Sequence, residues 1–189
     1  MSWKNSTERW GPVSQLLHWL IVLLVLVLAI VGLTMGELPK TPSNFWVYTL
    51  HKSVGITVLA LVLVRIAWRL HAGTPRPVPG TPTWQARIAS LTHLLLYALL
   101  LAMPLSGWLY DSASGLRPFR WFGLVEMPKL SAPNEGLSAL SNDVHEVLFW
   151  VLVALVALHA AAAFHHHLFR HDATLTRMLP RRRGSSGAG

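Results

Sequence analysis

The stretch from Val144 to His167, VHEVLFWVLVALVALHAAAAFHHH, is apolar enough to cross a bilayer, yet it carries several histidines. Two of them, His145 and His159, lie fourteen residues apart in the sequence. In an α-helix this spacing corresponds to about 21 Å along the axis and about 40° around it. One face of a single spanning helix would therefore present an imidazole near each membrane surface.

The rest of the chain has the composition of a membrane protein with one domain. Of its 189 residues, 52% are hydrophobic and only 13% are charged, and the mean hydropathy is +0.43. Such values are typical of membrane proteins. The pI is about 10.9, and so high a pI is also typical of nucleic-acid-binding proteins. The basic residues, however, are scattered between apolar runs and cluster only at 181–183. We therefore expect membrane lipid as a partner and no nucleic acid.

The sequence contains no cysteine. This excludes disulfides, thiolate metal sites, iron–sulfur clusters and the covalent attachment of haem through a C-x-x-C-H motif. A metal or cofactor in this protein must be held by histidine, methionine, carboxylate or the shape of its pocket.

Four segments of the chain are long enough to span a membrane. Three stretches, 11–36, 88–110 and 147–169, contain no charged residue, and about 20 apolar residues suffice for a spanning helix. A further stretch contains Lys52, Arg65 and Arg69, but these lie toward its ends, where long basic side chains reach the lipid headgroups. We predict an all-α membrane protein, a four-transmembrane-helix bundle formed by one domain over 1–183, followed by a disordered tail at 184–189. Its spans are predicted at about 14–36, 45–70, 87–110 and 142–169.

The basic residues predict the orientation of these spans. Four spans place both termini on one side, and eleven of the 16 basic residues lie on that side. By the positive-inside tendency both termini are cytoplasmic, and the loops 36–45 and 111–141 lie outside. The proline-rich connection 71–86 is expected to be an extended cytoplasmic linker.

With this topology the histidines form two layers. His51 and His145 share an outer layer, whereas His18, His93 and His159 share a cytoplasmic layer. A b-type haem takes an axial ligand on each side of its iron, and facing helices of a bundle can supply two imidazoles. The natural pairs are His51 with His145 and His18 with His159, although spacing alone also allows His93 as the partner of His159.

Other interpretations of these residues are open at the sequence level. A single imidazole in a membrane bundle commonly makes a cross-helix hydrogen bond, and small residues commonly allow close helix packing. Small residues that would also give room to a flat macrocycle are Gly55, Gly107 and Ala160 to Ala163.

The run His165 to His167 and nearby His171 raise the alternative of zinc or copper binding. Consecutive helical residues point about 100° apart, so three in a row cannot all face one ion. A divalent-metal transporter would also need carboxylates deep inside the membrane, and the predicted spans carry none away from their ends.

Several motifs, in this order, resemble one known family. They are SQLLHWL at 14–20, LHKSVGI at 50–56, LVRIAWRL at 63–70, HLLLYALLLAMPLSGW at 93–108, FGLVEMP at 122–128, VHEVL at 144–148, LHAAAAFHHH at 158–167 and DATLTRMLPRRR at 172–183. The chain resembles the bacterial di-haem cytochrome b561 family over essentially its whole length, from about Ser14 to Arg183.

The resemblance implies an inner-membrane bundle with two non-covalent b haems and ubiquinone as electron acceptor. It implies His18 and His159 as ligands of the cytoplasmic-side haem iron, and His51 and His145 as ligands of the periplasmic-side haem iron. It gives no ligand role to His93. One branch of the family oxidises superoxide to dioxygen, and other members are cytochrome b subunits that work with a dehydrogenase or hydrogenase. The short first loop, compact length and DATLTRMLP ending resemble the superoxide oxidase branch, so we expect an oxidoreductase.

Superoxide is a small anion, so its entry point would carry positive charge near the outer haem. Lys52, Arg117 and Arg120 are the candidates for this steering. Asp143 and Glu146 either orient the free ring nitrogen of His145 or tune the outer haem, or else they are carboxylates at a helix N-terminus, where the helix dipole favours them. The outer-loop aromatics, which either form an apolar quinone rim or anchor the loop at the interface, are Phe119, Trp121 and Phe122.

Overall fold

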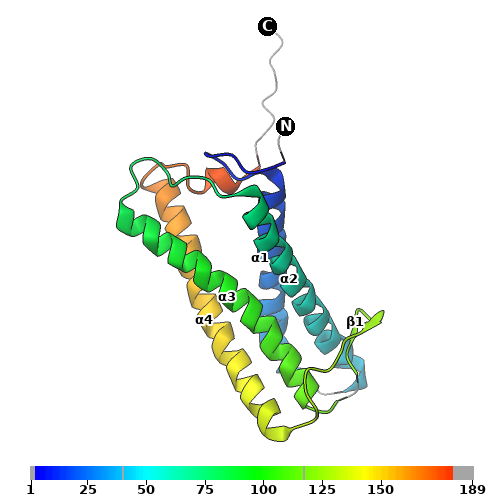
Figure 1. Ribbon diagram of the computed structural model, residues 1–189. Helices are drawn as coiled ribbons and strands as arrows, with labels where there is room; N and C mark the ends of the chain where they lie inside the picture. Colours follow the sequence, from blue (N-terminus) through cyan, green and yellow to red (C-terminus); the bar gives the residue numbers. More distant parts are fainter. Residues whose placement is uncertain (1–2, 40, 117, 181–189) are drawn as a thin grey trace.

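The protein is described by a computed structural model, in which residues 3–39, 41–116 and 118–180 are described. Its four long helices are α1 (Pro12–Met35), α2 (Phe45–Ala72), α3 (Thr83–Ala113) and α4 (Glu135–Leu168) (Figure 1). All four are long and apolar enough to cross a membrane, so the predicted four-helix membrane fold is confirmed. The remaining elements are the 3-10 turns η1 (Pro42–Asn44) and η2 (Thr176–Met178) and the strands β1 (Arg120–Trp121) and β2 (Val125–Glu126). The predicted tail at 184–189 lies outside the described residues.

Each helix extends beyond its predicted span at one end or both, and local signals explain two of the helix starts. Pro12 opens α1 in its first turn, where the missing N–H removes no helical hydrogen bond. The start of α4 is capped by Asn134, whose Oδ1 accepts a hydrogen bond from Leu137 N at 2.8 Å. α4 therefore begins at Glu135, seven residues before the predicted span.

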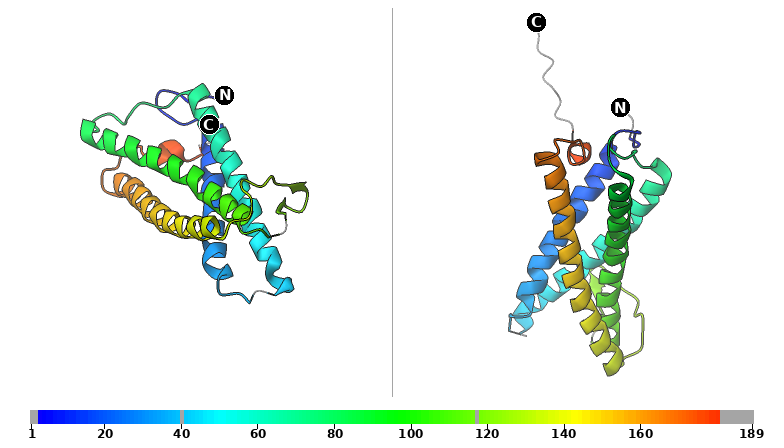
Figure 2. Two further views of the ribbon diagram at one scale, coloured as in Figure 1. Left: turned by 60° about the horizontal axis from the view of Figure 1, so that its bottom comes forward. Right: turned by 90° about the vertical axis from the view of Figure 1, so that its left-hand side faces the viewer.

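The packing of the bundle is that of a protein surrounded by lipid. Close backbone packing joins consecutive helices, α1 with α2, α2 with α3 and α3 with α4, and the α1–α2 and α3–α4 pairs diverge at one end (Figure 2). A small core of Ile21, Val58 and Val62 lies among the first three helices. Large apolar side chains elsewhere are exposed, among them Leu23, Ile30, Leu63, Leu94 and Val147, as expected where lipid replaces water.

One end of the bundle gathers the start of the chain, the α2–α3 linker and the segment after α4 (Figure 1); we call it the terminal end. Asn5 Nδ2 donates to Gly73 O at 2.6 Å, and Arg177 donates to Arg76 O at 2.8 Å. Trp19 Nε1 donates to Met178 O at 2.9 Å. These bonds fasten three chain segments, distant in sequence, across the same ends of the helices.

The opposite end, which we call the loop end, carries a small hairpin that the sequence did not predict. β1 and β2 pair antiparallel, with Arg120 opposite Glu126. Trp121 Nε1 donates to Ser53 O at 3.2 Å, and Phe122 N donates to the fully buried Ser53 Oγ at 2.9 Å. The turn places Phe122 at a φ of 47°, which is uncommon for a large side chain. The hairpin is thus tied to α2 just beyond His51.

Candidate functional site

The structure brings the predicted histidines together in two groups. At the loop end, the ring centroids of His51 and His145 are 6.3 Å apart; we call this pair the loop layer. At the terminal end, the His18 and His159 centroids are 6.5 Å apart, and His93 lies 5.4 Å from His159; these three form the terminal layer. The five histidines come from all four long helices, α1, α2, α3 and α4.

The distances fit two imidazoles that bind one metal from opposite sides. A metal–nitrogen bond of about 2 Å, with about 1 Å more from nitrogen to ring centre, separates two such centroids by about 6 Å. The separations of 6.3 Å and 6.5 Å agree with this value. The 5.4 Å between His93 and His159 is shorter, which favours His18 over His93 as the partner of His159.

His145 has one ring nitrogen committed to the protein. Its Nδ1 lies 3.1 Å from Met103 O and 3.0 Å from Ser106 Oγ, both on α3. Ser106 Oγ itself donates to Met103 O at 2.8 Å, so Nδ1–H donates to this pair of oxygens and Nε2 is left to accept a metal. In metal-binding histidines, a hydrogen bond from the ring nitrogen that does not bind the metal fixes the orientation of the ring.

The half-buried ring of His51 has less hydrogen-bond support than that of His145. Its Nδ1 has no hydrogen-bond partner in the described part of the chain. An unpaired buried nitrogen is costly, and a bound metal or a group carried by a cofactor would satisfy it. The ring leans on Gly32, where a Cβ would lie 3.3 Å from His51 Cε1.

A fourteen-residue spacing recurs on all four helices and was not recognised in the sequence. α4 carries His145 and His159, and α2 carries His51 and Arg65. The other two helices carry a histidine and a glycine at this spacing, His18 and Gly32 on α1 and His93 and Gly107 on α3. Gly107 lies against His145, where a Cβ would be 3.0 Å from its Cε1. The predicted space at Gly55 is different, because nothing lies within 4 Å of a Cβ there.

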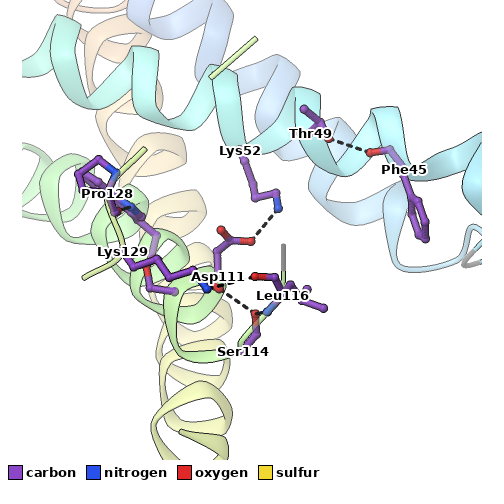
Figure 3. Close-up of polar contacts among 10 residues, drawn as sticks. Phe45, Thr49, Lys52, Asp111, Ser114, Leu116, Pro128 and Lys129 are labelled. Atoms are coloured by element: carbon purple, nitrogen blue, oxygen red, sulfur yellow. Dashed lines mark hydrogen bonds and ion pairs between the residues drawn. The ribbon is translucent and has the colours of Figure 1, made fainter. Parts of the chain in front are cut away.

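Lys52 and Arg120, the two candidate steering residues that the structure describes, lie at the loop end in different surroundings. Lys52 Nζ forms an ion pair with Asp111 Oδ1 at 2.7 Å (Figure 3) and lies 5.3 Å from the centroid of the buried Phe119 ring. Asp111 therefore offsets the charge of Lys52, which the sequence did not predict. Arg120 is exposed on β1, and Arg117 lies outside the described residues.

Asp143 and Glu146 neither orient the ring of His145 nor lie at the N-terminus of α4. Both are exposed, and the Nδ1 of His145 is bonded to α3 instead. Since α4 begins at Glu135, the two carboxylates also lie beyond its first turn. Of the loop aromatics, Trp121 anchors the hairpin to α2, and Phe122 is the exposed ring beside a shallow hollow lined by Trp46 and Leu50.

The histidine run at the end of α4 does not converge on a metal. His166 Nδ1 bonds Asp172 Oδ2 at 2.5 Å, and His165 stacks on Phe169 with centroids 5.4 Å apart. Partial desolvation raises the pKa of Asp172, but hydrogen bonds from His166 and Thr174 outweigh it and lower that pKa to about 2. Within 3–39, 41–116 and 118–180, no three histidine or carboxylate side chains are grouped to hold an ion.

A membrane bundle with paired imidazoles at two depths has the architecture of a b-type cytochrome. Sequence comparison agrees: a sequence model of the prokaryotic cytochrome b561 family matches residues 9–181. The chain belongs to this family. It is therefore a multi-pass bacterial membrane protein of electron transfer that binds b-type haem.

Three relatives cover nearly the whole chain. Cytochrome b561 homolog 2 of Escherichia coli (strain K12) is 33% identical over 95% of this chain and 95% of its own length. Cytochrome b561 homolog 1 of the same strain is 34% identical, over 93% of this chain and 99% of its own. A protein of Yersinia pestis named as a probable superoxide oxidase, CybB, is 33% identical over 89% of this chain and 94% of its own.

Proposed function

We propose that this protein oxidises superoxide to dioxygen on the outer side of the bacterial inner membrane and reduces ubiquinone. The observation that carries the proposal is the pair of layers, with imidazole centroids 6.3 Å and 6.5 Å apart at the two ends of one bundle. His51 and His145 would hold one haem, and His18 and His159 a second. The similarity to a probable superoxide oxidase supports superoxide as the substrate.

Bound haem supplies reversible one-electron transfer, and the chain supplies position and environment. His145 is oriented by Met103 and Ser106, which bond its Nδ1 and leave Nε2 to bind iron. The apolar helices exclude water around each layer. Two superoxide ions release two electrons on becoming dioxygen, and one ubiquinone takes up two electrons and two protons.

The orientation that fits this reaction places the terminal end in the cytoplasm and the loop end outside. Basic residues concentrate at the terminal end, as the positive-inside tendency requires. The loop layer then lies nearest the compartment in which superoxide would be met.

The test is ubiquinone reduction by the purified protein while an enzymatic source generates superoxide. We expect quinol to form at a rate that falls when superoxide dismutase competes for the substrate. If quinol formation is the same with and without dismutase, superoxide is not the donor. The alternative role, a cytochrome b subunit between a dehydrogenase or hydrogenase and quinone, would then be favoured by a co-purifying redox partner.

We propose that Lys52, Arg117 and Arg120 attract superoxide toward the loop layer. Replacing all three by glutamine is expected to lower the rate at low ionic strength roughly tenfold and to flatten its salt dependence, since steering of small anions is electrostatic. Stopped-flow kinetics over a range of salt concentrations would measure both.

Asp111→Asn is the matched control of opposite sign. It removes the carboxylate that lies 2.7 Å from Lys52 Nζ, so the rate at low salt should rise. An unchanged rate and salt dependence in the triple variant would rule out steering by these residues.

A further inference from the structure

The terminal layer contains an arginine for which the described chain offers no acidic partner. Arg65 lies fourteen residues after His51 on α2 and is half-buried. Its hydrogen-bond partners, Tyr97 and Ser14, lie four residues from His93 and His18, so Arg65 belongs to the same level of the bundle. The ion pairs in 3–39, 41–116 and 118–180 are Lys52 with Asp111 and His166 with Asp172, and neither includes Arg65.

The contacts of Arg65 fix its position without neutralising it. Its Nε donates to Tyr97 Oη at 3.1 Å, and one terminal nitrogen donates to Ser14 O at 2.9 Å. Both acceptors are neutral and come from other helices, α3 and α1. A guanidinium has five N–H donors in a fixed fork, so three donors remain for another ligand.

A second guanidinium lies beside the first. The guanidinium carbon of Arg69 is 5.8 Å from the centroid of the Tyr97 ring and 5.5 Å from that of Trp10. Two positive charges thus lie around Tyr97 toward the terminal end of α2, where an anionic group would stabilise both.

The two layers differ in a way that points to the anion. The loop layer has two glycines beside its rings, Gly32 on α1 and Gly107 on α3. The terminal layer instead has Arg65 on α2, whose position is fixed by hydrogen bonds to α3 and α1. Haem carries two carboxylates, and arginine binds carboxylates through paired hydrogen bonds.

We propose that Arg65, assisted by Arg69, binds the carboxylates of the haem in the terminal layer. This inference rests on the proposed function, because it requires haem between His18 and His159. Arg65 holds the cofactor in one orientation and raises its reduction potential, since a cation beside the carboxylates offsets charge that favours the oxidised iron.

The test is a redox titration of the full-length holoprotein, followed by visible spectroscopy. Arg65→Gln is expected to lower the potential of one haem step and leave the other in place. A tenfold fall in the equilibrium constant for reduction corresponds to about 59 mV for one electron. If Arg65→Gln does not fold, Arg69→Gln is titrated in the same way, with a smaller fall expected.

Two control variants separate charge from packing. Arg87→Gln makes the same charge change at the exposed start of α3 and should leave both steps unchanged. Tyr97→Phe removes the hydrogen bond to Arg65 but no charge. If Tyr97→Phe lowers the potential as much as Arg65→Gln does, packing explains the effect and the proposal is overturned.

Haem dimethyl ester identifies the source of the anion, because a phosphate of a lipid headgroup offers similar oxygens. Loaded with the ester, the wild type and Arg65→Gln should differ in potential by less than they do with haem, because Arg65 then has no carboxylate to bind. If the ester leaves the difference as large as it is with haem, the haem carboxylates are not the anion that Arg65 binds and the proposal is overturned. Wild-type protein that holds two haems while Arg65→Gln shifts nothing refutes this inference alone, whereas wild type without haem refutes the proposed function.

Discussion

His51→Ala and His159→Ala are each expected to remove one of two b haems and to leave the other bound. The reason is that each layer has its own pair of imidazoles, 6.3 Å and 6.5 Å apart, so the loss of one ligand leaves the other pair intact. A pyridine haemochrome assay counts the haems per chain, and a reduced-minus-oxidised spectrum shows which component is lost.

His93→Ala is the matched control for this experiment. His93 lies in the terminal layer, but its centroid is 5.4 Å from that of His159, less than the separation expected across a metal. The variant should retain two haems. Loss of a haem in His93→Ala but not in His18→Ala would exchange the roles of these two residues, and a colourless wild type would refute haem binding altogether.

The helices and the two histidine layers were predictable because their signals are periodic. Apolar runs without charge predict the spans, and fourteen residues between His145 and His159 place both on one face whatever the neighbouring helices do. Such signals depend only on the geometry of a single helix.

Contacts between chain segments were not predictable in the same way. Asp111 lies 59 positions from Lys52, and only the folded loop end brings them together at 2.7 Å. Likewise, the support of His145 comes from Met103 and Ser106 on another helix rather than from the neighbouring carboxylates. Proximity in sequence was a poor guide here because Asp143 and Glu146 point away into exposed positions.

The position of the two glycines that pack against the loop layer was predictable from their spacing. Gly107 was predicted to give room to a macrocycle and Gly32 was not, although each lies fourteen residues from a histidine on its own helix. In helices that alternate in direction, such a spacing moves from one membrane level to the other. A glycine at the far level is therefore a candidate neighbour for a histidine of another helix.

Gly107→Ala is expected to weaken haem binding in the loop layer about tenfold. An added Cβ would lie 3.0 Å from His145 Cε1 and 3.2 Å from its Nδ1, closer than ordinary packing allows. The ring cannot move aside freely because Nδ1 is bonded to Met103 O at 3.1 Å. A strained side-chain torsion costs about 1 kcal/mol, and weakening a hydrogen bond costs a part of the about 1 kcal/mol that the whole bond contributes. The total is therefore near 1.4 kcal/mol, which corresponds to about tenfold in affinity.

Gly55→Ala gives the contrast that makes the result specific. Both substitutions place alanine in a helix, which by itself stabilises the helix by about 0.5–1 kcal/mol, but nothing lies within 4 Å of a Cβ at Gly55. Haem content and thermal unfolding, measured on both variants, should therefore diverge: Gly55→Ala retains both haems at equal or higher stability, and Gly107→Ala loses the loop-layer haem first. Equal haem retention in the two variants would mean that the His145 ring has room to move, and that the glycine serves helix packing instead.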